Sequence, residues 1–390
     1  MATTESFFAT CPRGLEAGLA AEVTALGASY VTPTDGGVGF AGPLEIAYAA
    51  NLESRLASRI LWRVAHGRCR NEKELYALAQ DVAWEKHFRA DRTLRVDLAA
   101  TNSPLQSLEF ATLKVKDGVC DHFRAKVGSR PSIDKERPDV RVHAFLSERE
   151  ATLYLDTSGE ALFKRGYRRD ADAAPLRENL AAGLITLSGW TPGAAFLDPM
   201  CGSGTIAIEA ALIAADRAPG LTRSFGFQKL AWFDGPTWQR LRQRARDRVR
   251  SAPDTPFIFA SDIDARVVEI TGRNLAAAGV ADWVRSEPAD ALTRAAPAAG
   301  GMLIANPPYG VRMESDAALA AFYPKLGDAL KQRFAGWTAC LFSGDTRLPK
   351  LIGLRPSRKT PLFNGSIECR LYRFEMVAGR PERAAAARNG

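Results

Sequence analysis

The segment from Phe196 to Thr205 constrains the fold of this chain more than any other. It reads Phe-Leu-Asp-Pro-Met-Cys-Gly-Ser-Gly-Thr, so an apolar run leads into a glycine-rich turn. The residues that follow, as far as Ala215, have the pattern of a helix. Glycines let the backbone turn tightly and pass close to a ligand, and a helix that begins at such a turn offers free N–H groups. We therefore predict a buried strand, a ligand-binding turn and a helix.

Strand and helix patterns alternate through the whole C-terminal half. Buried strands are predicted at 194–197, 257–260 and 302–305, and a helix at 176–187. This alternation is typical of a parallel α/β sheet. The N-terminal half mixes short helices, alternating strands and turns, which predicts an α+β region.

A nucleotide-containing ligand is implied by the glycine-rich turn, but two common classes do not fit. A dinucleotide fingerprint needs a third glycine and an acid about 20 residues later, and a P-loop needs a Lys followed by Ser or Thr. Here Ala207 replaces the third glycine, and the next acid at a strand end is Asp262. Asp198, which precedes the glycines, suits a cationic group such as the ammonium of a methionine moiety. This points to S-adenosylmethionine (SAM).

Two further strand ends carry polar residues. Asp262 can accept hydrogen bonds from both ribose hydroxyls, although a helix cap is the alternative, and we expect Asp264 to be that cap. The run Asn306-Pro307-Pro308-Tyr309 follows the third buried strand. The Asn306 side-chain oxygen and the Pro307 carbonyl can accept hydrogen bonds from an –NH₂ group, and Tyr309 offers a face on which a flipped-out base can stack.

Charge and cysteine content narrow the function classes. The chain carries a net charge of +8, and the whole excess lies in residues 174–390, with 28 Lys and Arg against 20 Asp and Glu. A basic excess suits a polyanion, but many basic proteins bind no nucleic acid. The six cysteines form no C-x-x-C pair, so neither a metal site nor a disulfide framework is expected. No apolar run spans a bilayer and no basic signal region opens the chain, so we expect no membrane partner and a cytoplasmic location.

Basic residues gather in three places. The first is the predicted helix at 113–127, which is amphipathic and basic. The second is the run 164–169, which has four cations around one tyrosine. We interpret its segment as a linker able to lie against a phosphate backbone; the alternative is a solvated loop. The third place is a helix predicted at 236–250, with Trp238, Leu241, Ala245 and Val249 as its core stripe and six arginines at every second position. This spacing wraps them around the helix, which favours a solvated helix over one that reads RNA.

The motifs together resemble a known family. The strand-end tetrapeptide is similar to that of the class I amino-methyltransferases, (N/D)PP(Y/F/W). Nearly the whole chain resembles the THUMP-domain guanine-N2 methyltransferases of large-subunit (23S) ribosomal RNA, in their single-methylase form. The stretches that carry this resemblance are Cys11–Glu16, Leu113–Gly118, Arg137–Val142, Ser158–Arg168, Ala174–Ala182, the run DPMCGSGTIAIEAA from Asp198, Asn306–Gly310 and Asn364–Cys369.

The resemblance implies the domain organisation. A ferredoxin-like segment at 1–60 and an RNA-binding THUMP domain at 61–157 would precede a basic linker at 158–173, a Rossmann-like methyltransferase domain at 174–380 and a tail at 381–390. Some members of the family carry a second methylase domain. This sequence ends soon after the first, so we expect the guanine-N2 reaction alone.

The resemblance also implies residue roles. The donor would be bound by Asp198, Pro199, Gly202, Ser203, Gly204, Thr205, Asp262, Ile263 and, near adenine, Asp290. Catalysis would involve Asn306, Pro307, Pro308 and Tyr309, and RNA would be bound by Lys114, Lys116, Lys164, Arg165, Arg168 and Arg169. Cys201 has no neighbouring base and is interpreted as a small buried residue instead of a nucleophile.

Two rival functions stay open at this point. The same chemistry can act on another amine, in DNA adenine, tRNA guanine or a glutamine side chain. The RNA-binding half argues against the DNA and protein versions but not against tRNA. The second rival is an RNA-binding ribosome assembly factor with a vestigial methylase fold. The presence of Asp198, Gly202, Gly204, Asp262 and Asn306 argues against such decay.

Overall fold

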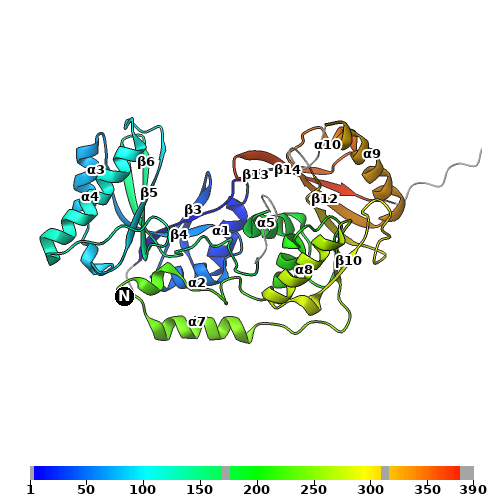
Figure 1. Cartoon of the computed structure of the whole chain (residues 1–390), viewed down its shortest axis with the longest axis horizontal. Coiled ribbons are helices and arrows are strands. Elements are labelled where there is room, and N and C mark those ends of the chain that lie inside the picture. Colours follow the sequence, from blue (N-terminus) through cyan, green and yellow to red (C-terminus); the bar gives the residue numbers. More distant parts are fainter. Residues whose placement is uncertain (1–3, 169–175, 309–315, 378–390) are drawn as a thin grey trace, which may run out of the picture. The chain divides into compact units, whose positions relative to one another are not determined.

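A computed structural model describes residues 4–168, 176–308 and 316–377, and they divide into two compact units. Unit 1 comprises Met1–Gly166 with Asp216–Val249, and unit 2 comprises Tyr167–Ala215 with Arg250–Gly390. Each unit is built on one seven-stranded sheet (Figure 1). Tyr309 and Arg169 lie outside the described residues.

The sheet of unit 1 has the strand order β2-β3-β1-β4-β7-β6-β5. All neighbours pair antiparallel except β5 and β6. The strands are β1 (Glu5–Thr10), β2 (Ser29–Thr34), β3 (Gly37–Gly42), β4 (Arg59–Arg68), β5 (Leu94–Thr101), β6 (Val140–Ser147) and β7 (Glu150–Asp156). The helices of the first 157 residues are α1 (Glu16–Ala25), α2 (Glu45–Glu53), α3 (Glu72–Asp81), the 3₁₀ turn η1 (Trp84–Lys86) and α4 (Leu108–Val127).

Strand β4 joins the two halves of this sheet. Its Trp62 pairs with Phe7 of β1 on one side and with Leu155 of β7 on the other. The boundary expected near residue 60 therefore falls inside a strand that both halves share.

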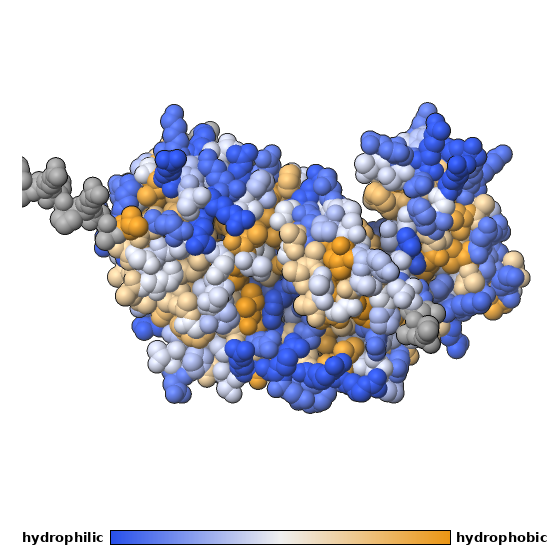
Figure 2. All heavy atoms as spheres, turned by 180° about the vertical axis from the view of Figure 1, so that it is seen from behind, coloured by the Kyte–Doolittle hydropathy of each residue, from blue (hydrophilic) through white to orange (hydrophobic). Residues whose placement is uncertain are grey.

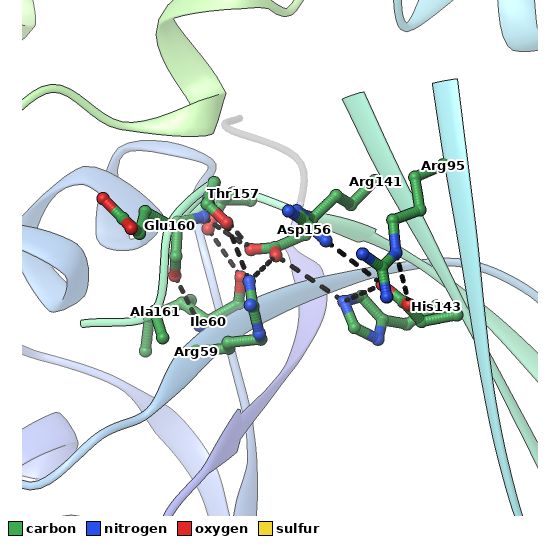
Figure 3. Close-up of polar contacts among 12 residues, drawn as sticks. Arg59, Ile60, Arg95, Arg141, His143, Asp156, Thr157, Glu160 and Ala161 are labelled. Carbon is green, nitrogen blue, oxygen red and sulfur yellow. Dashed lines mark hydrogen bonds and ion pairs between the residues drawn. The ribbon is translucent and has the colours of Figure 1, made fainter. Parts of the chain in front are cut away.

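A buried ion network holds the loop that follows β7 (Figure 3). Asp156 is fully buried, pairs with Arg59 and lies 3.5 Å from His143. Its carboxylate also accepts the N–H groups of Ser158 at 2.8 Å and Gly159 at 3.2 Å. Burial raises the pKa of this carboxyl, but His143 and Arg59 outweigh burial and hold the pKa below its usual range. Asp156 therefore fixes the backbone at the start of the predicted linker.

The predicted linker is anchored further along as well. Arg165 is only 4% exposed and donates to the carbonyls of Leu162 at 2.8 Å and Arg55 at 2.6 Å. Arg223 donates to the carbonyls of Glu160, at 2.6 Å, and Ala161, at 2.8 Å. As far as Gly166 this segment is thus anchored by hydrogen bonds to its backbone, which argues against the solvated loop that was the alternative interpretation.

Residues 216–249 pack with unit 1, although they lie within the range expected for the methylase. They form η2 (Gly226–Lys229) and α7 (Gly235–Asp247). Trp238 of α7 is buried against the rings of Tyr48, Phe225 and Phe227. The predicted core stripe is wrong at one position, because the helix ends at Asp247 and leaves Val249 exposed.

Unit 2 has the strand order β10-β9-β8-β11-β12-β14-β13, in which the first five strands run parallel. Its strands are β8 (Phe196–Asp198), β9 (Ile258–Asp262), β10 (Val284–Pro288), β11 (Gly301–Ala305), β12 (Trp337–Ser343), β13 (Arg358–Asn364) and β14 (Ile367–Glu375). Its helices are α5 (Glu178–Ser188), α6 (Thr205–Ala214), α8 (Ala265–Ala278), η3 (Ala281–Trp283), α9 (Asp316–Arg333) and α10 (Leu348–Leu351). Tyr323 and Leu326 of α9 pack with Leu303 and Leu341 in its core.

No helix in residues 4–168, 176–308 and 316–377 combines the length and apolarity that crossing a membrane requires. In the same residues, no group of three or more His, Cys, Asp or Glu side chains is arranged to hold a metal ion.

Candidate active site

Three polar residues stand at the carboxyl ends of adjacent parallel strands in unit 2. Strand β8 lies between β9 and β11, with Leu197 paired to Phe259 and to Leu303. Because parallel strands end at the same edge of a sheet, Asp198, Asp262 and Asn306 gather there. This is the edge at which open α/β sheets bind their ligands.

The glycine-rich turn between β8 and α6 adopts the expected conformation. Gly202 and Gly204 have φ values of +52° and +84°, which favour glycine. A Cβ atom on Gly204 would lie 2.7 Å from the Thr271 Cγ2 atom, whereas a Cβ on Gly202 would meet no atom within 4 Å. Gly204 therefore packs closely against α8 and leaves no room for a side chain, whereas Gly202 borders open space in which a ligand can lie.

Asp262 holds the turn through its side chain. Its Oδ2 atom accepts the Gly202 N–H at 3.0 Å, and its Oδ1 atom accepts the Asp264 N–H at 3.2 Å. Asp264 is the N-cap of α8, as predicted, and accepts the Arg266 N–H at 2.9 Å. Ile263, between the two acids, is 76% exposed and presents an apolar surface at the same edge.

Asp198 is buried with one carboxylate oxygen unsatisfied. Its Oδ1 atom accepts the Met200 N–H at 3.3 Å, while its Oδ2 atom has no partner among the described residues. Burial, together with the negative charge of Asp262, raises the pKa of Asp198 to about 8. A buried, unpaired acid needs a cationic partner, and the ammonium group of a methionine moiety has that chemistry.

Asn306 shows the same feature at the end of β11. Its Oδ1 atom is buried and has no hydrogen-bond partner among the described residues. Pro307 and Pro308 supply no N–H donors, so the backbone here can only accept. The Pro308 carbonyl accepts the hydroxyl of Tyr323, a fully buried residue of α9, at 3.2 Å.

The other residues predicted to bind the methyl donor are buried or bonded within the protein and support the backbone of the site. Pro199 and Ser203 are buried, and the Thr205 hydroxyl accepts a hydrogen bond from Arg168 at 2.7 Å. Asp290 follows β10 and accepts the Leu292 N–H at 2.9 Å, so its side chain caps a turn. Burial raises the pKa of the Cys201 thiol, which agrees with a residue that packs and does not react.

The predicted RNA-binding cations are placed in different ways. Lys164 is exposed and pairs with Glu160 at 2.7 Å, and Lys116 pairs with Asp117 at 2.8 Å. Lys114 lies 5.0 Å from the centre of the exposed Phe110 ring. Arg168, like Arg165, differs from the prediction. Its side chain is 14% exposed and bonds to protein oxygens, so neither arginine is offered to a phosphate.

Sequence reasoning missed three residues that hold the site. The Thr271 hydroxyl donates to the Gly202 carbonyl at 2.6 Å, and the Asn274 amide donates to the Ser203 carbonyl at 3.0 Å. Both lie on the buried stripe of α8 beside Val268 and Leu275, and a polar residue within an apolar stripe was the available signal. Tyr323 gave no such signal, because a tyrosine in a helix core is ordinary.

Comparison with known proteins identifies the family. Residues 165–373 match the family model described as RMKL-like, methyltransferase domain. The chain belongs to this family. Residues 69–156 match the THUMP domain, and residues 6–61 match the RlmL ferredoxin-like domain. Unit 2 thus has the Rossmann-like methyltransferase fold, and the sheet of unit 1 carries the other two domains.

Relatives and solved structures agree with this family. Ribosomal RNA large subunit methyltransferase K/L of Syntrophotalea carbinolica is 42% identical over 384 residues, which cover 96% of this chain and 54% of that protein. The chain thus spans about half the length of the K/L relatives that it matches. Protein slr0064 of Synechocystis sp., named provisionally as an RNA methyltransferase, is 39% identical over 96% of this chain and 98% of its own.

Two crystal structures share the fold over nearly the whole chain. SMU.472, complexed with SAH (S-adenosylhomocysteine), has a TM-score of 0.86 and 30% identity and covers 98% of this chain and 100% of its own. A predicted N6-adenine-specific DNA methylase from Listeria monocytogenes has the same TM-score and identity, covering 95% of this chain and 96% of its own.

Proposed function

We propose that this chain is a SAM-dependent methyltransferase that methylates the exocyclic N2 amine of a guanine in large-subunit ribosomal RNA, giving N2-methylguanosine. The observation that carries this proposal is a pair of unsatisfied acceptors at neighbouring strand ends, the Asp198 Oδ2 and Asn306 Oδ1 atoms. An unsatisfied buried acceptor is costly, so each is expected to find a donor in the working complex. One acceptor suits an ammonium group and the other suits an amine.

The donor site fits SAM in four respects. The Asp198 carboxylate would hold the ammonium of the methionine moiety, and Gly202 would leave room for the chain that follows it. Asp262 retains lone pairs for the ribose hydroxyls, and the exposed Ile263 would cover the adenine face. When bound, SAM supplies an electrophilic methyl group on a sulfonium.

The acceptor site would prepare the amine. The Asn306 side-chain oxygen and the Pro307 carbonyl would accept its two hydrogens, which localises the nitrogen lone pair toward the methyl group. Tyr309 would stack on the flipped guanine. The proton becomes acidic only after attack, so no strong general base is required, and positioning supplies most of the rate, worth several kcal/mol.

The RNA substrate is supported by unit 1 and by the names of the relatives. A THUMP match covers residues 69–156, and the K/L relatives are named for the large ribosomal subunit. RNA would be contacted by Lys114, Lys116 and Lys164, and a chain that acts on ribosomal RNA would work in the cytoplasm.

Transfer of labelled methyl from SAM to large-subunit ribosomal RNA without its native modifications tests this proposal. Nucleoside analysis should find N2-methylguanosine, and mapping would give its position. Label found only in tRNA, in DNA adenine or in protein would show that the substrate is that molecule and not large-subunit ribosomal RNA. If calorimetry detected no binding of SAM, the proposal that the chain is a methyltransferase would be wrong, and a non-catalytic assembly factor would be favoured.

A further inference from the structure

Helix α7 and the three residues that follow it are strongly basic. Residues 235–250 contain six arginines and a single acid, Asp247, against a net charge of +8 for the whole chain. Arginines four residues apart are neighbours on a helix surface, and each such pair of like charges destabilises the helix by roughly 0.2–0.5 kcal/mol. The helix therefore pays a cost in free energy that a polyanion laid against it would relieve.

The apolar face of α7 is already occupied. Trp238 packs its ring 5.1 Å from that of Phe227 and 6.3 Å from that of Tyr48, and the Tyr48 hydroxyl accepts the Asp234 N–H at 2.8 Å. An amphipathic helix on a membrane inserts its apolar face, but this face is buried in unit 1. Only the charged sides of α7 are available to a partner.

Three of the arginines already have partners. Arg240 donates to the Thr237 hydroxyl at 2.7 Å, and Arg242 lies 5.6 Å from the centre of the Trp238 ring. Arg248 forms two hydrogen bonds with the carboxylate of Glu53, at 3.1 and 2.7 Å. These contacts of Arg240 and Arg242 lie within α7, whereas the pair between Arg248 and Glu53 of α2 ties the end of the helix to the rest of unit 1.

The two arginines between them are differently placed. Arg244 and Arg246 are exposed, and neither forms a hydrogen bond or ion pair within the described part of the chain. They are two positions apart and so lie on opposite flanks of the outer face. Asp247 is engaged on that face by the Gln243 amide at 2.7 Å. Figure 2 shows the hydrophilic strip that runs along the lower edge of the molecule, where Figure 1 places α7.

We propose that α7 is a phosphate-contacting surface of unit 1, on which Arg244 and Arg246 hold the backbone of the RNA substrate from both flanks of the helix. This deepens the proposed function and rests on it. Two arginines on opposite flanks cannot form a single row in a groove, so the surface positions RNA and reads no bases.

The test is the salt dependence of RNA binding by the full chain. The double variant Arg244→Gln/Arg246→Gln should lower the magnitude of the slope of log Kobs against log[salt] by about 1.4 to 1.8, and weaken binding on the order of tenfold at ~0.1 M salt. The probes are an unmodified large-subunit ribosomal RNA transcript and poly(U), and the loss should be similar for both. In methyl transfer, KM for RNA should rise while kcat stays unchanged.

Matched controls separate this surface from a general loss of charge. The variant Arg89→Gln/Arg370→Gln also removes two cations, each of which already faces a carboxylate at 3.1 Å, and it should keep the wild-type slope. The charge-retaining variant Arg244→Lys/Arg246→Lys should keep it too.

Three outcomes would overturn the proposal. If the Gln variant of α7 binds RNA with the wild-type slope while the wild type binds and methylates RNA, the α7 surface is refuted and the proposed function stands. If the wild type binds no RNA, the proposed function fails first. If the Gln variant instead loses binding to phosphatidylserine vesicles and keeps RNA binding, α7 faces a lipid surface.

Discussion

At the residue scale, the site is defined by acceptors that lack donors. Asp198 and Asn306 are both held in place by their strands, and each keeps one buried oxygen without a partner among the described residues. Folded proteins satisfy nearly all buried polar atoms, so such pairs mark places where a ligand completes the structure. In the proposed function, the Asp198 carboxylate would hold the ammonium of the methyl donor and the Asn306 oxygen would hold the amine of the substrate.

Removing the Asn306 amide should separate chemistry from donor binding. We expect Asn306→Ala to abolish turnover, because the amine loses the oxygen that localises its lone pair. SAH binding should survive, because the proposed function places the donor on Asp198 and Asp262, which the substitution leaves unchanged. Calorimetry with SAH and single-turnover methyl transfer measure the two effects. Near-normal turnover in the variant would show that the proposed mechanism is wrong.

The pKa of Asp198 predicts how donor affinity depends on pH. Because this pKa is raised to about 8 in the free protein, the carboxyl is protonated at pH 6 and ionises as the pH rises. A cationic group binds the ionised form, so affinity should increase with pH, by at most about tenfold per unit below pH 8. Calorimetry with SAH between about pH 6 and 7.5, where the ligand's amino group stays charged, checks this.

The variant Asp198→Asn is the control for that pH series. It should bind SAH more weakly and lose the dependence on pH, because an amide does not titrate. A wild-type affinity that is flat across the series would argue against ionised Asp198 as the ammonium partner.

At the scale of elements, Gly202 and Gly204 of the glycine-rich turn both have a positive φ but lie in different surroundings. Alanine at either position should cost roughly 1–2 kcal/mol of stability, because its φ would be positive. Gly204→Ala would also place its Cβ 2.7 Å from Thr271, so it should destabilise unit 2 further. Gly202→Ala meets no atom and should mainly weaken SAH binding. Denaturant unfolding and calorimetry of both variants test this contrast, and equal losses of stability would contradict it.

The backbone at Pro308, just after β11, accepts a hydrogen bond from α9. Pro307 and Pro308 have no N–H group to donate, and the Tyr323 hydroxyl donates to the Pro308 carbonyl at 3.2 Å. We expect Tyr323→Phe to lower kcat for methyl transfer by about five- to tenfold, which corresponds to one hydrogen bond of ~1 kcal/mol. Donor affinity should be unchanged. A variant with wild-type kcat would show that Tyr323 does not position the backbone at Pro308.

At the scale of the whole molecule, the chain passes between its two units more than once. Residues 216–249 leave unit 2, add α7 to unit 1, and return. The order of residues along the chain is therefore a poor guide to which core each helix stabilises.

Trp238 provides a test of this arrangement. Trp238→Ala should destabilise unit 1 by roughly 3–5 kcal/mol, because a large buried side chain leaves a cavity. Hydrogen exchange should speed up in β1, β4 and α2, and SAH binding by unit 2 should remain. Faster exchange confined to unit 2 would contradict the division of the chain.

The sequence by itself was enough to predict the strand, turn and helix around Gly202 and Gly204, the polar strand ends Asp198, Asp262 and Asn306, and the cap at Asp264. These features depend on local periodicity and on residues a few positions apart, which any reader of the chain can see. Only the tertiary structure decided that Arg165 and Arg168 donate their hydrogen bonds to protein oxygens and that α7 packs in unit 1. It also decided that Thr271, Asn274 and Tyr323 support the backbone of the site. Each of these outcomes depends on contacts or burial that are fixed only when the chain has folded.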